Sequence, residues 1–150
     1  MTEKKRDTFI YEGLGFPIRL VNVPMKKVFG EWVIEINFNT LQVAVLNMLA
    51  RKHTLLTGSE LCFIIDYLEM STREFAKLFG VTHAAVLKWE NEESRMNPST
   101  EISIRLYILN HLKVTDKEFR KAYLTFNPEI ISKYGIESIP LEVDAEKIAC

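Results

Sequence analysis

Cysteine is scarce in this sequence of 150 residues. Only Cys62 and Cys150 are present, far apart and outside any CxxC or CxxH cluster, so we expect neither a zinc site nor a disulfide framework. No apolar run reaches the length of about 18 residues needed to cross a bilayer. The basic residues at 4–6 are not followed by the apolar segment of a secretion signal. We therefore expect a cytoplasmic protein without a membrane partner.

Positive charge is not in excess either. Lysine and arginine number 19 against 20 acidic residues, which gives a net charge of −1. The net charge is +3 over residues 1–56 and −2 in each of the segments 57–113 and 114–150. This balance excludes a large basic domain, so any binding of nucleic acid must depend on the local placement of cations.

Catalytic motifs are lacking as well. The chain has no glycine-rich phosphate loop, no GxSxG and no HExxH motif, and its histidines, His53, His83 and His111, do not have the spacing of metal ligands. We therefore expect neither an enzyme nor a bound metal or cofactor. What is present is a globular composition, 47% hydrophobic and 26% charged, which can form a packed core.

The first 40 residues predict a small β-rich segment. Apolar residues recur at every second position over 16–20 and again over 32–38, and prolines and glycines interrupt the pattern. Two or three short antiparallel strands fit this pattern better than a helix does. A linker helix over 41–56, capped by Asn39 or Thr40, is expected to cover their apolar face.

From Thr57 onward the sequence predicts a series of helices, because capping side chains recur at regular positions. Segments starting at Thr57, Ser71 and Thr115 have the spacing of a capping box, and the Asn-Pro pairs at 97–98 and 127–128 place a capping residue before proline. The expected helices are Ser59–Glu69, Thr72–Phe79, His83–Glu90, Pro98–Leu112, Asp116–Leu124 and Pro128–Tyr134.

Residues 72–91, TREFAKLFGVTHAAVLKWEN, carry the densest pattern in the chain. Gly80 lies between two short helices, where glycine allows positive φ, and Ala76 is small where the helices approach each other. Apolar side chains at Phe75, Phe79, Val81, Val86 and Trp89 are expected to face a core shared with Leu61, Ile64, Ile65 and Leu68 of the preceding helix. This is the layout of a helix-turn-helix.

The stretch from Thr57 to about Leu112 resembles the XRE/Cro-type helix-turn-helix of phage-repressor-like regulators. The residues in family positions are Ala76, Gly80, Val81, Val86 and the Trp89-Glu90 pair. Thr72 and Ile65 differ from the glutamine and arginine that many members have there. The resemblance implies a dimeric protein that binds double-stranded DNA.

A narrower resemblance extends to the N-terminal part. Gly13-Leu-Gly-Phe-Pro and Asn22-Val-Pro, followed by a linker helix and the helix-turn-helix, look like the MqsA-type antitoxins of toxin–antitoxin operons. In that family a zinc-binding N-terminal domain engages the toxin, and the C-terminal part dimerises and binds operator DNA. Residues 1–61 of this chain contain no cysteine, so the zinc site is absent and the resemblance implies only the DNA-binding half.

The expected fold class is mainly helical α+β: a small N-terminal antiparallel β segment followed by a five-helix, lambda-repressor-like helix-turn-helix domain. The expected segments are a β-rich part (1–40), a linker helix (41–56), the DNA-binding domain (57–113) and a C-terminal helical extension and tail (114–150). The final stretch, 136–150, is consistent with an edge strand, a partner-binding tail or disorder.

A recognition helix places its outward side chains against base edges in the major groove, and neighbouring groups contact phosphates. The expected base-reading residues are His83, Ala84, Leu87 and Lys88, and the expected contacts to the DNA backbone are Thr72, Arg73, Lys77 and Thr82. Lys88 can donate to the O6 and N7 acceptors of guanine. The helix at 98–112 is the expected dimer seam, through Ile102, Leu106, Leu109 and Leu112, although the same stripe can complete the core of one protomer.

The expected function is therefore an autorepressor of antitoxin type. The alternative is a protein-interaction module that binds a toxin or another partner and uses the helix-turn-helix as a dimer scaffold; the apolar Leu87 on the reading face favours it. A further alternative is that this region is a compact helical domain without a nucleic-acid role. We further expect Trp32 and Trp89 in the core, Cys62 partly buried and unreactive, and the carboxylates at 90–93 in a solvated loop.

Overall fold

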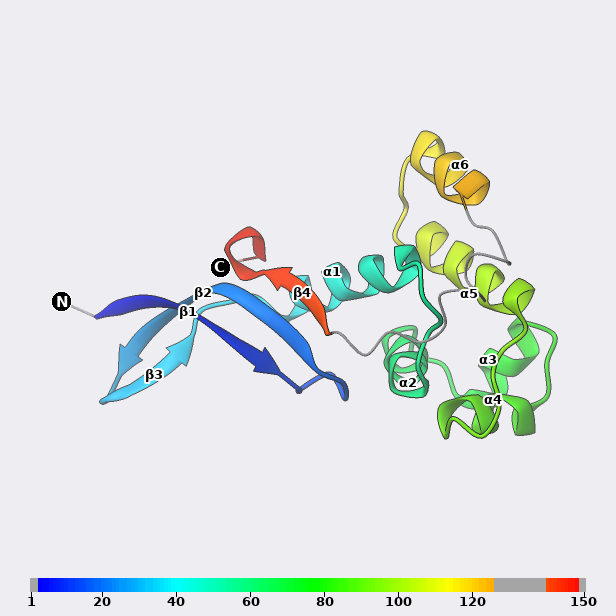
Figure 1. Ribbon diagram of the computed structural model, residues 1–150, viewed down its shortest axis with the longest axis horizontal. Coiled ribbons are helices and arrows are strands. Elements are labelled where there is room, and N and C mark those ends of the chain that lie inside the picture. Colours follow the sequence, from blue (N-terminus) through cyan, green and yellow to red (C-terminus); the bar gives the residue numbers. More distant parts are fainter. Residues whose placement is uncertain (1–2, 126–139, 149–150) are drawn as a thin grey trace. The chain divides into compact units, whose positions relative to one another are not determined.

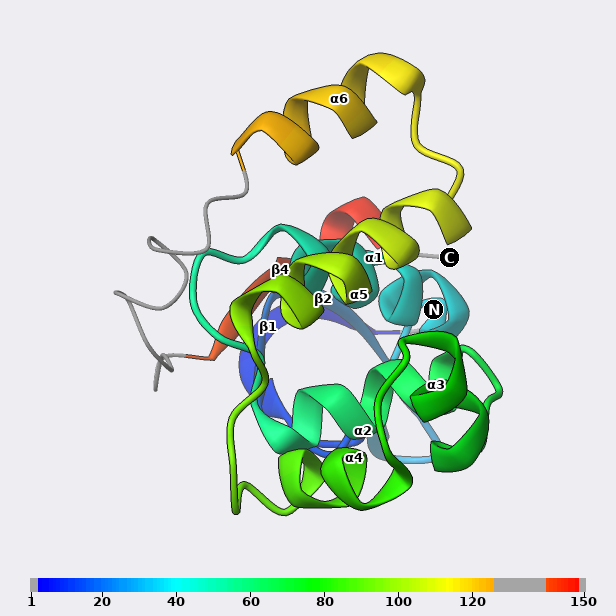
Figure 2. The same ribbon diagram turned by 90° about the vertical axis from the view of Figure 1, so that its right-hand side faces the viewer.

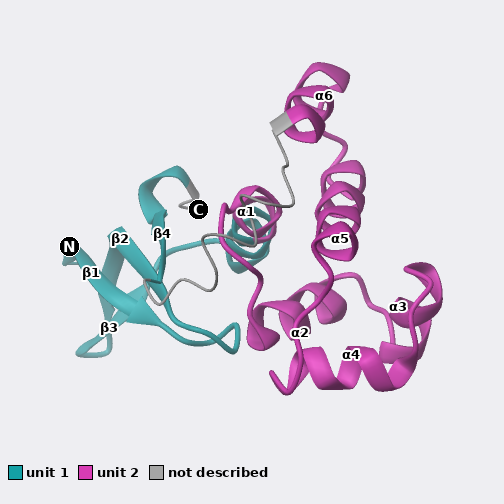
Figure 3. Ribbon diagram, turned by 45° about the vertical axis from the view of Figure 1, so that its right-hand side comes forward, with its two compact units in different colours: residues 1–45, 139–150 teal, residues 46–138 magenta. Residues whose placement is uncertain are grey.

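The computed structural model describes residues 3–125 and 140–148 and has an α+β fold, with six α-helices and a four-stranded sheet in the described part of the chain (Figure 1). The chain forms two compact units (Figure 3). Unit 1 comprises residues 1–45 and 139–150, and unit 2 comprises residues 46–138. No described helix is both long enough and apolar enough to cross a bilayer.

The sheet of unit 1 is built around one long strand. β2 (Ile18–Val28) pairs antiparallel with β1 (Lys4–Tyr11) and with β3 (Glu31–Ile34), so the predicted antiparallel strands are confirmed. Alternation along β2 places Ile18 and Leu20 in the core of this unit, and Val23 is buried there as well because the pairing of β2 with β1 shifts register between Leu20 and Val23.

The last strand was one of three alternatives for the chain's final stretch. β4 (Leu141–Asp144) pairs parallel with β2, and Val143 lies buried opposite Leu20. Arg19 Nη1 and Glu142 Oε2 form an ion pair of 3.2 Å between the two strands. The edge strand is therefore the correct alternative for these residues, while residues 136–139 lie outside the described part.

Helix α1 (Phe38–Arg51) starts earlier than predicted. The cap is Asn37, whose Oδ1 accepts from the backbone amides of Asn39 at 3.0 Å and Thr40 at 3.2 Å. Asn39 and Thr40 are thus inside the first turn, and the prediction that one of them caps the helix is wrong. An Asn one residue ahead of the first helical position is well placed to reach these free amides.

Unit 2 contains α2 (Gly58–Tyr67), α3 (Thr72–Leu78), α4 (His83–Glu90), α5 (Pro98–His111) and α6 (Asp116–Thr125). These helices match the predicted ones to within two residues at each end. The predicted caps at Thr57, Ser71, Asn97 and Thr115 each accept a hydrogen bond from a backbone amide of the first turn. The helix predicted at Pro128–Tyr134 lies outside the described residues.

The two units divide the chain differently from the four predicted segments. The boundary falls within α1, between residues 45 and 46, rather than at either end of that helix. β4 belongs to unit 1 because it pairs with β2, so the predicted C-terminal segment 114–150 contributes to both units.

Candidate nucleic-acid interface

The segment that joins α3 to α4 is built by local hydrogen bonds. Ser71 Oγ accepts from the amide of Glu74 at 3.1 Å and starts α3, and Thr82 Oγ1 accepts from the amide of Ala85 at 3.1 Å and starts α4. Between them Gly80 has φ of +67°, and the following amide, that of Val81, donates to the carbonyl of Ala76 at 2.9 Å. The predicted glycine with positive φ is confirmed, and it closes the C-terminal end of α3.

Helix α4 packs by one side against α2 and α3, and Figure 2 shows α4 beside α2. Val86 and Phe75 have no exposed surface, and the core of unit 2 that they join also contains Leu61 and Ile64. Trp89 is only half-buried, so it lies at the edge of this core. The inward side of α4 is therefore fixed, and its other side is left for contacts outside the unit.

Gly58 marks a close approach of α2 and α4. A Cβ atom at this position would lie 2.2 Å from the backbone oxygen of Glu90. The Gly58 amide also donates to Glu92 Oε1 at 3.0 Å. Sequence reasoning treated this glycine only as part of the capping box at Thr57, because nothing local indicates that another helix will touch it.

Cys62 provides a second link between these helices. Its Sγ donates to Glu90 Oε2 at 3.0 Å. Burial, followed by the hydrogen bond and the negative charge of Glu90, raises the pKa of the Cys62 thiol to about 12. The side chains of Glu90 and Glu92 thus hold α4 against α2. The prediction of a solvated acidic loop is wrong for Glu90, which is half-buried, whereas Glu92 is exposed as predicted.

The base-reading residues predicted on α4 differ in exposure. Ala84, Leu87 and Lys88 are exposed, with Leu87 at 40%. His83 is half-buried, and its Nε2 lies 2.8 Å from Thr72 Oγ1. Three of the four positions thus form an open face, while His83 joins the start of α4 to the start of α3.

The residues predicted to contact the DNA backbone also fall into two groups. The hydroxyls of Thr72 and Thr82 are engaged, the first with His83 and the second as the cap of α4. Arg73 and Lys77 are exposed on α3. Neither of them, nor Lys88, forms an ion pair with another described residue.

The predicted dimer seam on α5 lies partly in the core. Leu109 is completely buried within unit 2, so it is not available on the surface of this unit. Ile102, Leu106 and Leu112 are half-buried. The most buried apolar side chains of α5 also include Ile104 and Ile108, since the helix turns this side to the rest of the unit.

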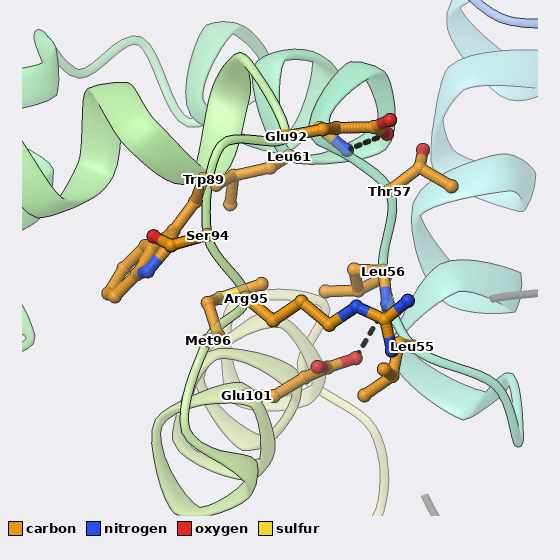
Figure 4. Close-up of a pocket in the computed structure, with 11 residues that line it drawn as sticks. Leu55, Leu56, Thr57, Leu61, Trp89, Glu92, Ser94, Arg95, Met96 and Glu101 are labelled. Carbon is orange, nitrogen blue, oxygen red and sulfur yellow. Dashed lines mark hydrogen bonds between the residues drawn. The ribbon is translucent and has the colours of Figure 1, made fainter. Parts of the chain in front are cut away.

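A buried ion pair on α5 was missed by sequence reasoning. Arg105 is fully buried and its Nη2 lies 2.7 Å from Glu101 Oε1. The guanidinium also donates to the carbonyls of Lys52 and Thr54. The Glu101 carboxylate accepts from the Leu56 amide at 2.7 Å (Figure 4). The pair thus holds the loop between α1 and α2. Its signal in the sequence is Glu and Arg four residues apart among apolar residues.

A pocket of about 160 Å³ lies beside these contacts (Figure 4). Its walls include Leu55 and Leu56 before α2, Trp89 at the end of α4, and Met96 before α5. The pocket is built from the segments that hold α4 in place. No group of three or more metal-ligating side chains occurs in residues 3–125 and 140–148.

Comparison with known proteins gives no relative. No family model, no curated protein and no solved structure matches this chain.

Proposed function

We propose that unit 2 is a helix-turn-helix DNA-binding domain of the XRE type and that the protein is a transcriptional regulator. In this proposal α4 enters the major groove, and the other half of a dimer binds a second half-site. The observation that carries the proposal is the two-sided character of α4. One side is fixed by Val86 and the contacts of Glu90, and the other presents Ala84, Leu87 and Lys88 to solvent.

Charge and chemistry support this choice of face. The Lys88 ammonium group is exposed and unpaired among the described residues, so it can donate to guanine O6 and N7 without first breaking an ion pair. The methyl group of Ala84 fits against a thymine methyl. Arg73 and Lys77 on α3 can contact phosphates, while Thr72 positions α4 through His83.

We further propose that the regulator represses its own promoter, as antitoxins of the family it resembles do. The test is a fluorescence-anisotropy titration of labelled DNA from the region upstream of its own gene. We expect saturable binding at nanomolar to micromolar protein, and Lys88→Ala to weaken it by about 1–3 kcal/mol at the base that Lys88 reads. Lys117→Ala, at an exposed position on α6, is the matched control and leaves binding unchanged.

Two results would overturn the proposal. One is an absence of binding even at low salt. The other is a Lys88→Ala variant that binds every single-base variant of the DNA as tightly as the parent protein does, because Lys88 then reads no base.

The exposed Leu87 favours a second candidate function, a protein-interaction module. An apolar side chain at the centre of the open face of α4 suits a protein partner better than a phosphate backbone. A protein that fails to bind DNA at low salt, but co-purifies with a partner that Leu87→Glu releases, would be this module.

A further inference from the structure

The turn between β2 and β3 carries an aromatic side chain that the fold of the unit does not require. Phe29 is completely exposed, at 102% of its reference surface, and its φ is +50°, followed by Gly30 with φ of +82°. Two-residue turns in which both φ angles are positive favour Asn-Gly, and a bulky side chain is disfavoured there. Since the Phe29 ring is not buried within the unit, a contact with another molecule would explain why a phenylalanine occupies this turn.

The sheet face next to this turn is also open. Met25 pairs with Lys5 of β1 and with Ile34 of β3, and the next position of β2 on this face, Lys27, pairs with Trp32. Residues opposite each other in antiparallel strands share a face, so these side chains lie together. The same face is buried two residues before Met25, at Val23, and is open toward the turn.

Trp32 is on this open face rather than in the core. It is 36% exposed, and the Nζ atoms of Lys5 and Lys27 lie 4.5 Å and 5.9 Å from its ring centroid. The expectation of a core tryptophan here is wrong, because β3 extends beside the part of β2 that the core does not cover. We call the patch the hairpin surface; its apolar members are Met25, Phe29, Trp32 and Ile34.

The charges around the hairpin surface indicate what kind of partner it fits. Lys5 and Lys27 are matched by two carboxylates, with Lys5 Nζ 3.7 Å from Asp7 Oδ2 and Lys27 Nζ 3.6 Å from Glu3 Oε2. These pairs are exposed, so they contribute little to stability and can exchange partners. DNA or an anionic membrane would require an excess of cations. Equal numbers of both signs suit a copy of the same surface related by a two-fold axis.

We propose that the hairpin surface binds a second copy of this chain. In the symmetric dimer, the Phe29 ring of each protomer packs on the apolar patch of the other, and the lysines of one copy meet the carboxylates of the other. The proposal deepens the proposed function, since it names the contact through which two DNA-binding units are joined, and it replaces the α5 seam, of which Leu109 is buried.

The test is sedimentation-velocity ultracentrifugation of the full chain over a range of concentrations without DNA. We expect a reversible dimer, and Phe29→Asn to raise its dissociation constant about tenfold or more. Asn suits positive φ, so this variant keeps the turn. Leu124→Asn, which removes another largely exposed apolar side chain, from α6, is the control and leaves the dimer unchanged.

Trp32→Thr is the second variant and also weakens the dimer while keeping a residue that favours β-strands. A chain that is monomeric at all concentrations, or a dimer that both variants leave intact, overturns the proposal. Binding of DNA with a single half-site is measured separately and is expected to be the same for Phe29→Asn and the parent protein. Failure of dimerisation and failure of DNA binding are thereby distinguished.

Discussion

Gly58 shows how one missing side chain sets the position of a whole helix. Its Cα approaches the C-terminal end of α4 so closely that a Cβ atom would lie 2.2 Å from the Glu90 oxygen and 2.9 Å from the Trp89 oxygen. Both atoms belong to the backbone of α4, so they cannot move out of the way by a change of rotamer. Relief of the clash requires α2 and α4 to move apart.

We therefore expect Gly58→Ala to destabilise the protein by about 1–3 kcal/mol, the usual cost of overpacking, although alanine is the better helix former. The control is Ser59→Ala, at the exposed next position of α2, which is expected to change stability by less than about 0.5 kcal/mol. Urea unfolding followed by circular dichroism measures both. Equal midpoints of urea unfolding for Gly58→Ala and the parent protein would contradict the close approach of α2 to α4.

The thiol of Cys62 is expected to be unreactive at neutral pH. Burial and the contact with Glu90 raise its pKa to about 12, and the thiolate is the reactive form. In a Cys150→Ser background, alkylation of the folded chain by iodoacetamide should remain slow up to about pH 10. Glu90→Gln removes the charge that helps to raise the pKa, so the reaction should then begin at lower pH.

The same raised pKa gives the sign of a pH effect on stability. The folded protein holds the Cys62 proton more tightly than the unfolded chain does. The contribution of this proton to the free energy of unfolding is therefore complete below the ordinary thiol pKa and is lost as pH rises toward 12.

Alkylation of Cys62 that reaches half its maximal rate near pH 8.5 in the folded chain would show that the pKa of the thiol is not raised.

At the scale of elements, the pair of Glu101 and Arg105 connects α5 to the loop before α2. Each partner also bonds to the backbone of that loop, through the Leu56 amide and the Thr54 carbonyl. Removing one partner leaves the other as a buried, unpaired charge. The pair thus contributes to stability mainly by joining α5 to that loop, and less as an isolated ion pair within the helix.

Arg105→Met should therefore destabilise unit 2 by about 3–5 kcal/mol. The double variant Glu101→Gln/Arg105→Met should be more stable than Arg105→Met alone, because the uncompensated carboxylate is gone while the amide oxygen still accepts from Leu56. Thermal unfolding of the two single variants and the double variant gives the coupling between the sites. Additive losses would show that the two side chains do not act as a pair.

The helices of unit 2 were predictable because their start signals are local. Thr57, Ser71 and Asn97 lie next to the amides they cap, and a sequence window of four residues contains both partners. The sequence predicts the cap of α1 too late because three suitable capping residues, at positions 37, 39 and 40, lie close together. β4 could not be assigned, since its partner β2 lies more than 100 residues away in the sequence.

The candidate site was predictable to a similar extent. Helical spacing places Ala84, Leu87 and Lys88 on one side of α4, and all three are exposed. The spacing does not reveal that Thr72 of another helix contacts His83, or that the rest of unit 2 covers Leu109. The sequence predicts Trp32 in the core for the same reason: alternation indicates which side chains share a face, but not where along a strand that face is covered.

At the scale of the whole molecule, the net charge of −1 means that the protein has no general attraction for DNA. Binding must come from cations placed at the interface. The proposed interface has three in each protomer: Arg73, Lys77 and Lys88, all exposed and without ion pairs to other described residues. The affinity for DNA should therefore fall only moderately as the salt concentration rises, because few charged groups contact the DNA.

For two phosphate contacts, from Arg73 and Lys77, the slope of log K against log salt concentration is about −0.9 × 2, or about −1.8 per protomer, and about twice that for a dimer on both half-sites. We expect anisotropy titrations between about 50 and 300 mM KCl to give this slope, and neutralisation of Arg73 and Lys77 by glutamine to remove most of it. Lys113→Gln, at an exposed lysine between α5 and α6, is the matched control. A slope that the Arg73 and Lys77 variants leave unchanged would place the phosphate contacts elsewhere on the molecule.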